Sequence, residues 1–223
     1  MSFKSLSLTA AAAAVLALTG AAHAATTNGF ANGGFETAGA TTPANAWLAA
    51  ASGYTRSTDA HSGSFSAQLA SPAFNAAVML QNSIKEGGLP PLTVGDTPML
   101  SFWAKGFAGG TGNVLFALRY LDGIGNILAN SGNVFFQNSI NTSTWTQITY
   151  TLAGGVPAGA TAAYIEFSQG IGPIDATNLA GKVLVDDLYL GVVAAAVPEP
   201  GTYGLLLAGL GVVGAMARRR RAV

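Results

Sequence analysis

The sequence predicts an all-β protein: a two-sheet antiparallel β-sandwich of the jelly-roll type, flanked by an N-terminal signal helix and a single C-terminal transmembrane helix. Between residues 25 and 191, short apolar or alternating runs are separated by clusters of Gly, Asn, Asp, Ser and Pro, a pattern typical of strands joined by turns. The runs are rich in β-branched and aromatic residues, which favour strands. No stretch in this region shows a long apolar stripe with the helical period.

The N-terminal segment, residues 1–24, is interpreted as a secretory signal peptide. Lys4 supplies its positive charge, residues 6–18 form an apolar stretch rich in Ala and Leu, and Ala22-His23-Ala24 is an Ala-x-Ala cleavage site. The sequence therefore predicts that the domain that follows, residues 25–191, is exported.

Eight strands are expected in this domain, and their number and spacing favour a jelly roll. They are predicted at Phe65–Leu69, Ala76–Asn82, Met99–Lys105, Asn113–Leu121, Gly132–Gln137, Thr144–Leu152, Ala162–Ser168 and Lys182–Leu190. Trp103 and Trp145 lie within or next to these runs, so we expect them in the core.

Composition limits the possible functions of the exported domain. Residues 25–196 contain five basic and nine acidic residues, a net charge of −4, and no basic patch, so nucleic-acid binding is excluded. The chain has no cysteine, so the domain depends on a hydrophobic core for stability. Its length is sufficient for one such core.

Catalytic residues are scarce, and the sequence predicts that the protein is not an enzyme. His61 is the single histidine after residue 24, there is no cysteine nucleophile, and no serine lies in a G-x-S-x-G motif. No recognisable glycosidase motif places two carboxylates together.

The C-terminal end, residues 197–223, has three parts that follow a short linker at residues 192–196. They are the tetrapeptide Val197, Pro198, Glu199 and Pro200; the uncharged segment 202–217; and the basic block Arg218, Arg219, Arg220 and Arg221. The two prolines favour an extended, exposed tetrapeptide. The apolar segment is a short membrane span, and the arginines should remain in the cytoplasm.

These three parts, in this order at the C-terminus, resemble the PEP-CTERM sorting signal of Gram-negative bacteria. The resemblance implies recognition by an exosortase, a membrane-embedded processing enzyme, and cleavage near the tetrapeptide. The precursor would be exported through the inner membrane, held transiently by its C-terminal helix, and then released to the cell surface or extracellular matrix.

The domain itself carries a second ordered set of motifs. They are Asn32-Gly33-Gly34-Phe35-Glu36, His61-Ser62-Gly63-Ser64-Phe65-Ser66, Leu100-Ser101-Phe102-Trp103-Ala104-Lys105, Trp145-Thr146-Gln147-Ile148-Thr149, Ala163-Tyr164-Ile165-Glu166-Phe167 and Val185-Asp186-Asp187-Leu188-Tyr189-Leu190. This set resembles the jelly-roll carbohydrate-binding modules of glycoside hydrolases and galactose-binding domains generally. The resemblance implies extracellular polysaccharide as a partner. Trp47 and Tyr54 flank an Ala-rich stretch, so we expect their rings to stack on sugars.

The same resemblance implies one structural calcium ion between the N-terminal segment and the last strand. Glu36 and Asp186 are the matching carboxylates. Calcium takes about six to eight oxygen ligands, including backbone carbonyls, which the loop at Ser62-Gly63-Ser64 could supply. The sequence leaves an alternative open, in which Asp186 lies at a sheet end and accepts backbone hydrogen bonds.

Together these features predict an exported, non-catalytic cell-surface or extracellular-matrix protein that is sorted by an exosortase and binds polysaccharide. Two alternatives stay open at this point. One is a secreted enzyme acting on polysaccharide, with a carboxylate pair that the sequence does not reveal. The other is a purely structural matrix protein without a defined ligand.

Overall fold

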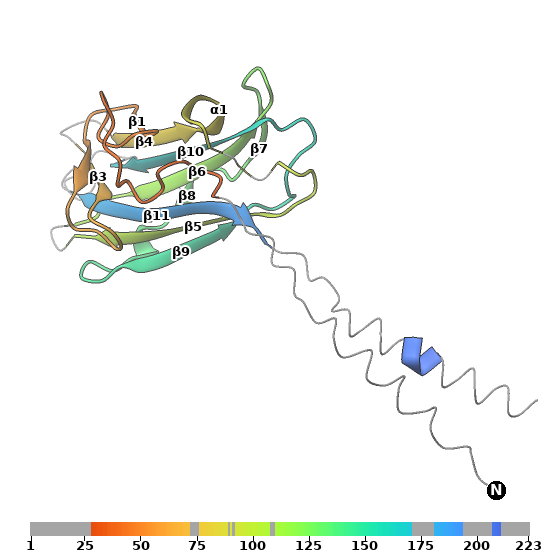
Figure 1. Cartoon of the computed structure of the whole chain (residues 1–223). Coiled ribbons are helices and arrows are strands. Elements are labelled where there is room, and N and C mark those ends of the chain that lie inside the picture. Colours follow the sequence, from red (N-terminus) through yellow and green to blue (C-terminus); the bar gives the residue numbers. More distant parts are fainter. Residues whose placement is uncertain are drawn as a thin grey trace, which may run out of the picture. The chain divides into compact units, whose positions relative to one another are not determined.

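The computed structural model of the chain describes residues 28–71, 76–88, 90, 92–107, 110–170, 181–193 and 207–210 (Figure 1). Residues Thr26–Val193 form one compact unit, distinct from a second unit made of the two ends of the chain. The described part of this unit is mostly β-strands and loops, and the α-helix found there is the single turn α1 (Ser83–Glu86).

Two antiparallel sheets make up this unit (Figure 1). Sheet A has the order β1-β4-β10-β6-β7, with β8 also beside β6, and sheet B has the order β2-β3-β11-β5-β9. The strands of sheet A are β1 (Leu48–Ala49), β4 (Ala77–Asn82), β10 (Ala162–Gln169), β6 (Val114–Leu121), β7 (Ile127–Asn130) and β8 (Val134–Phe135). Those of sheet B are β2 (Tyr54–Ser57), β3 (Ser66–Ala70), β11 (Lys182–Val192), β5 (Pro98–Gly106) and β9 (Thr146–Thr151). The predicted β-sandwich is confirmed.

The core lies between the sheets and follows from the two-residue period of the strands. Along β5, buried and half-buried residues alternate without exception, as expected when one face of a strand points inward. Phe102, from β5, sits at the centre of an aromatic cluster. Its ring makes edge-to-face contacts with Phe116, Phe136 and Phe167 at centroid distances of 5.6, 5.2 and 5.0 Å, an arrangement that aromatic pairs prefer.

The last strand, β11, is the central strand of sheet B and also holds the start of the described chain. The N–H of Gly29 donates to the carbonyl of Leu190 at 2.8 Å. The Asn28 amide donates to the carbonyl of Leu188 at 2.7 Å and accepts the N–H of Leu190 at 3.1 Å. The two ends of the sandwich therefore meet along β11.

The signal peptide, the motif at 197–200 and the basic block at 218–221 lie outside the described residues. Of the apolar segment 202–217, the structure describes only residues 207–210, which are helical. No helix within the described part of the chain is long and apolar enough to cross a membrane. The predicted signal and transmembrane helices therefore remain predictions.

Candidate functional site

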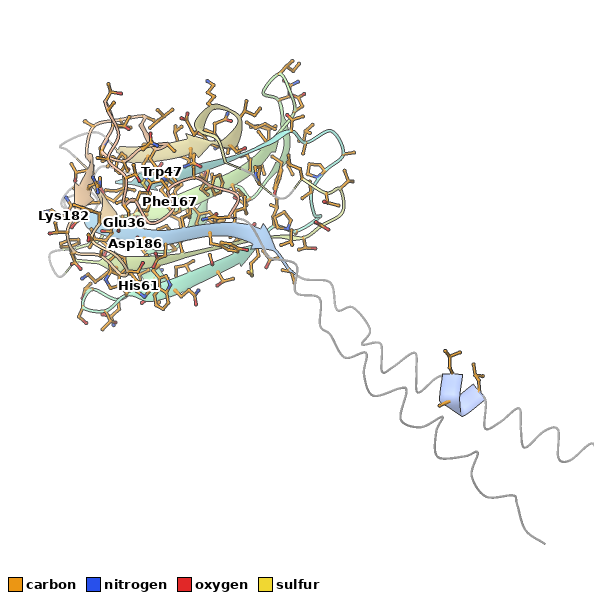
Figure 2. The ribbon with its side chains drawn as sticks, in the orientation of Figure 1. Glu36, Trp47, His61, Phe167, Lys182 and Asp186 are labelled. Carbon is orange, nitrogen blue, oxygen red and sulfur yellow. The ribbon has the colours of Figure 1, made fainter. Side chains whose placement is uncertain are left out.

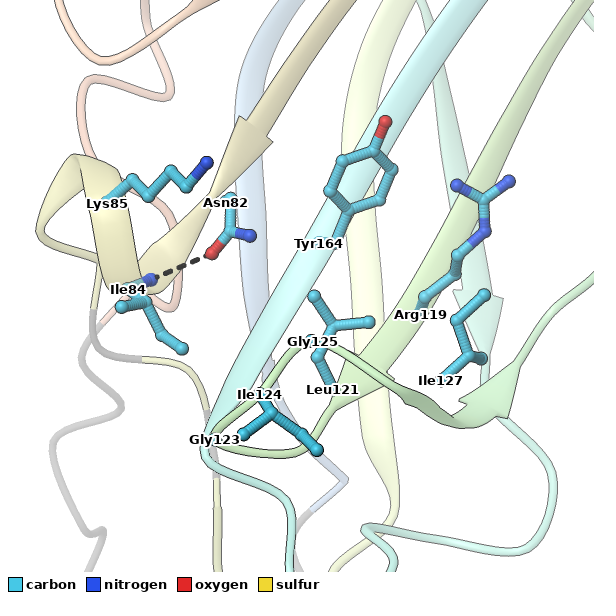
Figure 3. A pocket seen from close by; sticks show the side chains of 10 residues that line it. All are labelled: Asn82, Ile84, Lys85, Arg119, Leu121, Gly123, Ile124, Gly125, Ile127 and Tyr164. Atoms are coloured by element: carbon cyan, nitrogen blue, oxygen red, sulfur yellow. Dashed lines mark hydrogen bonds between the residues drawn. The ribbon is translucent and has the colours of Figure 1, made fainter.

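A cleft of about 500 Å³ opens on the outer face of sheet A (Figure 3). This volume is in the range of sites that bind small molecules. The lining comes from β4, α1, β6, β7, β10 and the turn between β6 and β7. It consists of Asn82, Ile84, Lys85, Arg119, Leu121, Gly123, Ile124, Gly125, Ile127 and Tyr164. The lining has two positive charges and no carboxylate, and a group of apolar side chains lies at one end.

The polar side of the cleft is a row of residues that lie directly opposite one another on neighbouring strands. Tyr164 pairs with Asn82 of β4 on one side and with Arg119 of β6 on the other, and Arg119 pairs with Asn130 of β7. Residues opposite one another in antiparallel strands share a face, so the sheet register assembles this row. In Figure 3 the Tyr164 ring stands between Asn82 and Arg119.

Glu166 lies two residues after Tyr164 on the same face of β10 and holds the side chains of this row by hydrogen bonds and an ion pair. The hydroxyls of Tyr164 and Ser168 donate to its two oxygens at 3.0 Å each, and the Arg119 guanidinium lies 3.4 Å from Oε2. Burial and the nearby carboxylate of Glu166 raise the pKa of Tyr164 to about 12. The phenol is therefore a neutral hydroxyl at physiological pH, and its oxygen can also accept a hydrogen bond from a ligand.

Arg119 carries an unsatisfied donor at this site. Its guanidinium lies 5.1 Å from the centre of the Tyr164 ring, a cation–π contact, while its Nε is buried and has no hydrogen-bond partner within the described structure. A buried N–H without a partner costs about 1–3 kcal/mol. The Nε of Arg56 on sheet B is buried and unpartnered in the same way, so this group by itself does not mark a ligand site.

One lip of the cleft is a tight turn between β6 and β7 that is held by Asp122. Its Oδ1 accepts the N–H groups of Ile124 and Asn126 at 3.0 and 2.8 Å, and its Oδ2 accepts the Asn126 amide at 2.9 Å. These hydrogen bonds lower the pKa of Asp122. The turn presents Ile124, which is 86% exposed, beside the polar row.

The two aromatic residues expected to stack on sugars are not available to a ligand, so that prediction is wrong. Trp47 is fully buried, with its ring 5.0 Å from that of Phe35 and its Nε1 donating to the carbonyl of Asn32 at 3.0 Å. Tyr54 is 4% exposed. Both rings complete the core where the irregular N-terminal segment covers it, and the Ala-rich stretch between them does not leave them in solvent.

The carboxylates expected to bind calcium both contact one loop, residues 61–65 (Figure 2). The N–H groups of His61 and Ser62 donate to Oδ2 of Asp186 at 2.8 and 3.2 Å. Those of Ser64 and Phe65 donate to Oε1 of Glu36 at 3.0 and 2.9 Å. We call this arrangement the carboxylate clamp. Asp186 accepts backbone hydrogen bonds, as in the alternative, but it lies within β11, at the irregularity between Asp186 and Tyr189, and not at a sheet end.

The donor set of the clamp suits calcium in part. Asp186 is fully buried, and burial raises its pKa to about 6 against the lowering effect of the N–H groups of Asp187, His61 and Ser62. A cation would compensate such a buried charge. The described residues contain no group of three or more His, Asp or Glu that could hold a metal, so the remaining ligands would be backbone carbonyls and water. Calcium binding stays a prediction.

On the outer face of sheet B, the clamped loop covers two tryptophans. The His61 ring stacks on Trp103 at 3.8 Å and meets the edge of Trp145 at 5.9 Å. Its Nδ1 lies 2.6 Å from Oδ2 of Asp187. Both tryptophans are half-buried, so the expectation that they lie in the core is wrong. Trp103 is on the same side of β5 as Lys105, which points away from the core.

Comparison with known proteins identifies the tail. Residues 196–221 match the PEP-CTERM protein-sorting motif, which confirms the resemblance seen in the sequence. No curated protein matches the chain.

Comparison with solved structures concerns the sandwich. The enzymatically active domain of tailspike protein 4 from bacteriophage CBA120 is similar, with 22% identity and a TM-score of 0.55 over 74% of this chain. The match covers 21% of the tailspike chain, so this chain spans about a fifth of it.

The structural neighbours also include carbohydrate-binding modules. TmCBM61, solved with β-1,4-galactotriose, is 18% identical with a TM-score of 0.46 over 74% of this chain and 99% of its own. The xylan-binding CBM22-1 domain of Paenibacillus barcinonensis Xyn10C is 15% identical with a TM-score of 0.45 over 73% of this chain and 93% of its own.

Proposed function

We propose that this protein is an exported, non-catalytic surface or matrix protein whose sandwich binds extracellular polysaccharide in the cleft on sheet A. The observation that carries the proposal is the partly exposed guanidinium of Arg119 beside the half-buried ring of Tyr164 in an open cleft. A sugar can contact both groups at once. Its hydroxyl oxygens accept from the arginine, and its apolar ring face contacts the aromatic ring, a pairing that suits amphipathic ligands.

The absence of a carboxylate in the cleft lining supports binding over hydrolysis. Glycosidases use two carboxylates on opposite sides of the scissile bond, separated by about 5–9.5 Å. Glu166 is the carboxylate beside the cleft, and it is engaged by Tyr164, Ser168 and Arg119. These partners fix it as an acceptor that positions the row.

A glycan array probed with the fragment 26–193 tests this proposal. We expect binding to one class of polysaccharide, and at least tenfold weaker binding for Tyr164→Ala, since aromatic contacts and hydrogen bonds together contribute above 1.4 kcal/mol. Gln68→Ala is the matched control because Gln68 lies on sheet B and its side chain meets only Thr55 in the described contacts. Equal loss in both variants, or release of sugar from any glycan, would contradict the proposal.

For sorting, we propose that an exosortase processes the tail near Val197–Pro200. The sorting-motif match at residues 196–221 supports this. Replacing Pro198-Glu199-Pro200 with alanines should leave the full-length precursor in the membrane fraction of a host that has the sorting enzyme. Release of this variant at the level of the unmodified protein would exclude processing at the tetrapeptide.

A structural calcium ion is the last part of the proposal. Glu36 and Asp186 would hold it, and the ion would neutralise the buried carboxylate and tie the N-terminal segment to β11. The support is that both carboxylates converge on the 61–65 loop, although they are far apart in the sequence.

A further inference from the structure

Strand β9 forms a free edge of sheet B, because among the described strands it pairs only with β5 (Figure 1). Its six residues, Thr146–Thr151, contain no charge, no proline and no glycine. Natural sandwiches usually protect such an edge with a charge, a proline, a bulge or a very short strand, because unpaired backbone groups are a template for another strand.

The other edges of the sandwich are protected in these ways. At the opposite edge of sheet B, β2 carries Arg56, whose guanidinium donates to the carbonyl of Glu36 at 2.9 Å and lies 3.7 Å from the centre of the Phe65 ring. In sheet A, the edge strand β1 has only two residues, and β7 has four. Among the described strands, the edge at β9 is therefore the longest and the least protected.

The register with β5 shows which backbone groups of β9 are free. The N–H of Leu152 donates to the carbonyl of Pro98 at 3.0 Å, and Met99 lies opposite Thr151. Antiparallel pairs alternate between hydrogen-bonded and non-hydrogen-bonded. Thr146, Ile148 and Tyr150 therefore direct their backbone groups toward β5. Their neighbours Gln147, Thr149 and Thr151 direct theirs toward the free edge.

We propose that β9 pairs with β9 of a second copy of this chain. The two strands would run antiparallel about a two-fold axis at Thr149, which joins the two five-stranded sheets B into one. Thr149 would then lie opposite its own copy and Gln147 opposite Thr151. These three hydrogen-bonded pairs exchange two bonds each, about six in total.

Side chains agree with this register. Ile148 and Tyr150 point inward and pack on the core, but both remain half-buried at the open edge. In the proposed register Ile148 lies opposite the partner's Tyr150 in the closely spaced, non-hydrogen-bonded pair, so the exposed parts of both are covered. On the outer face, the exposed side chains of Gln147, Thr149 and Thr151 carry no charge. No like charges meet across the interface, and this self-complementarity favours a second copy over a charged peptide.

Analytical ultracentrifugation of the fragment 26–193 tests the proposal. We expect a concentration-dependent dimer below about 0.1 mM, the range in which small interfaces with micromolar dissociation constants assemble. Thr149→Pro removes a donor that faces the free edge, where proline is tolerated in an edge strand, and should weaken the dimer at least tenfold. Thr149→Val is the matched control, because it keeps the N–H and should retain the dimer.

A second pair of variants tests the interface without altering the backbone. Thr149→Lys and Thr149→Asp each place two like charges opposite one another and should weaken the dimer about fivefold. An equimolar mixture should restore association by pairing opposite charges. A monomeric fragment over the whole range, a dimer indifferent to Thr149→Pro, or two charged variants that do not associate when mixed would each overturn the proposal.

Discussion

The two outer faces of the sandwich are built from the same alternating strands, yet they differ in what covers them. On sheet A the row formed by Asn82, Tyr164 and Arg119 lines an open cleft. On sheet B the carboxylate clamp accepts four backbone N–H groups of the 61–65 loop. That loop in turn places His61 over Trp103.

This difference separates stability from binding. The clamp contributes to the free energy of unfolding, because removing one of its carboxylates leaves the N–H groups that donate to it unsatisfied. The cleft on sheet A is open to solvent, so a ligand can contact its side chains directly. We therefore expect changes on sheet B to lower stability and changes on sheet A to lower affinity, and the following predictions test that division.

The largest effect is expected for Asp186→Ala in the clamp. The change leaves the N–H groups of His61, Ser62 and Asp187 without their acceptor. At about 1–3 kcal/mol for each unsatisfied group, we expect the free energy of unfolding to fall by about 3 kcal/mol or more. Urea denaturation of the fragment 26–193 measures this. A loss below about 1 kcal/mol, the typical cost of an ordinary substitution, would show that the clamp is not what holds the loop.

Calcium removal comes next. If an ion sits at Glu36 and Asp186, a hundredfold excess over its dissociation constant adds on the order of 3 kcal/mol, a shift of several degrees in Tm. We expect EDTA to lower the Tm of the fragment 26–193 and added calcium to restore it. Glu36→Gln should abolish the response, while Glu166→Gln, on the other sheet, should keep it. If EDTA leaves the Tm unchanged, the clamp is stabilised by the N–H hydrogen bonds to its carboxylates alone.

On sheet A, Arg119→Met should weaken polysaccharide binding about tenfold, since it removes hydrogen bonds to the ligand. The free energy of unfolding should change by less than about 1 kcal/mol, because the long apolar chain keeps the packing and an unsatisfied donor is lost with the guanidinium. Titration calorimetry and urea denaturation of one sample measure both. Strong destabilisation with unchanged affinity would reverse the assignment of the two faces.

The smallest effect is expected from pH. The pKa of Tyr164 is raised to about 12, above the ordinary value of about 10 for an unfolded chain. The neutral phenol therefore contributes to the stability of the folded state. This contribution to the free energy of unfolding is fully present below about pH 10 and is lost as the pH rises through about 12. Affinity for polysaccharide should be constant from about pH 7 to 9. A decline in that window that Tyr164→Phe abolishes would show that the hydroxyl ionises earlier.

Much of the fold could be predicted because strands and turns leave local traces in the sequence. All eight predicted strands overlap observed ones, from β3 to β11. The strands β1, β2 and β7, which have two or four residues, are not predicted from the sequence. Strands this short show too little alternation to be distinguished from loops.

The tryptophans differ from the sequence-based prediction, and for Trp103 the neighbouring residues indicate the observed orientation. In β5, Trp103 lies on the same face as Ser101 and Lys105. Phe102 lies on the opposite, buried face with Leu100 and Ala104. The polar neighbours indicate that Trp103 points outward. Trp47 offers no such clue, because it lies outside any long strand and is buried by tertiary contacts with Phe35 and Asn32.

The cleft could be predicted only in part. Tyr164 and Glu166 alternate with buried residues of β10, which places them on the outer face. Their meeting with Arg119 and Asn82 depends on the register between β10, β6 and β4. Register between strands this far apart in the sequence is set by tertiary packing, and a shift of one residue would send each side chain to the other face.

The position of β11 determines how the domain carries mechanical load. The chain leaves the sandwich from this strand, which is hydrogen-bonded to β3 on one side and β5 on the other. A pull directed along β11 would load both ladders in shear, so many hydrogen bonds would resist together. If the tail left from an edge strand such as β9, a pull could instead separate that strand from the sheet by breaking its hydrogen bonds one at a time. A load applied to sheet A would reach sheet B through the aromatic core, where Phe102 contacts Phe116 and Phe167.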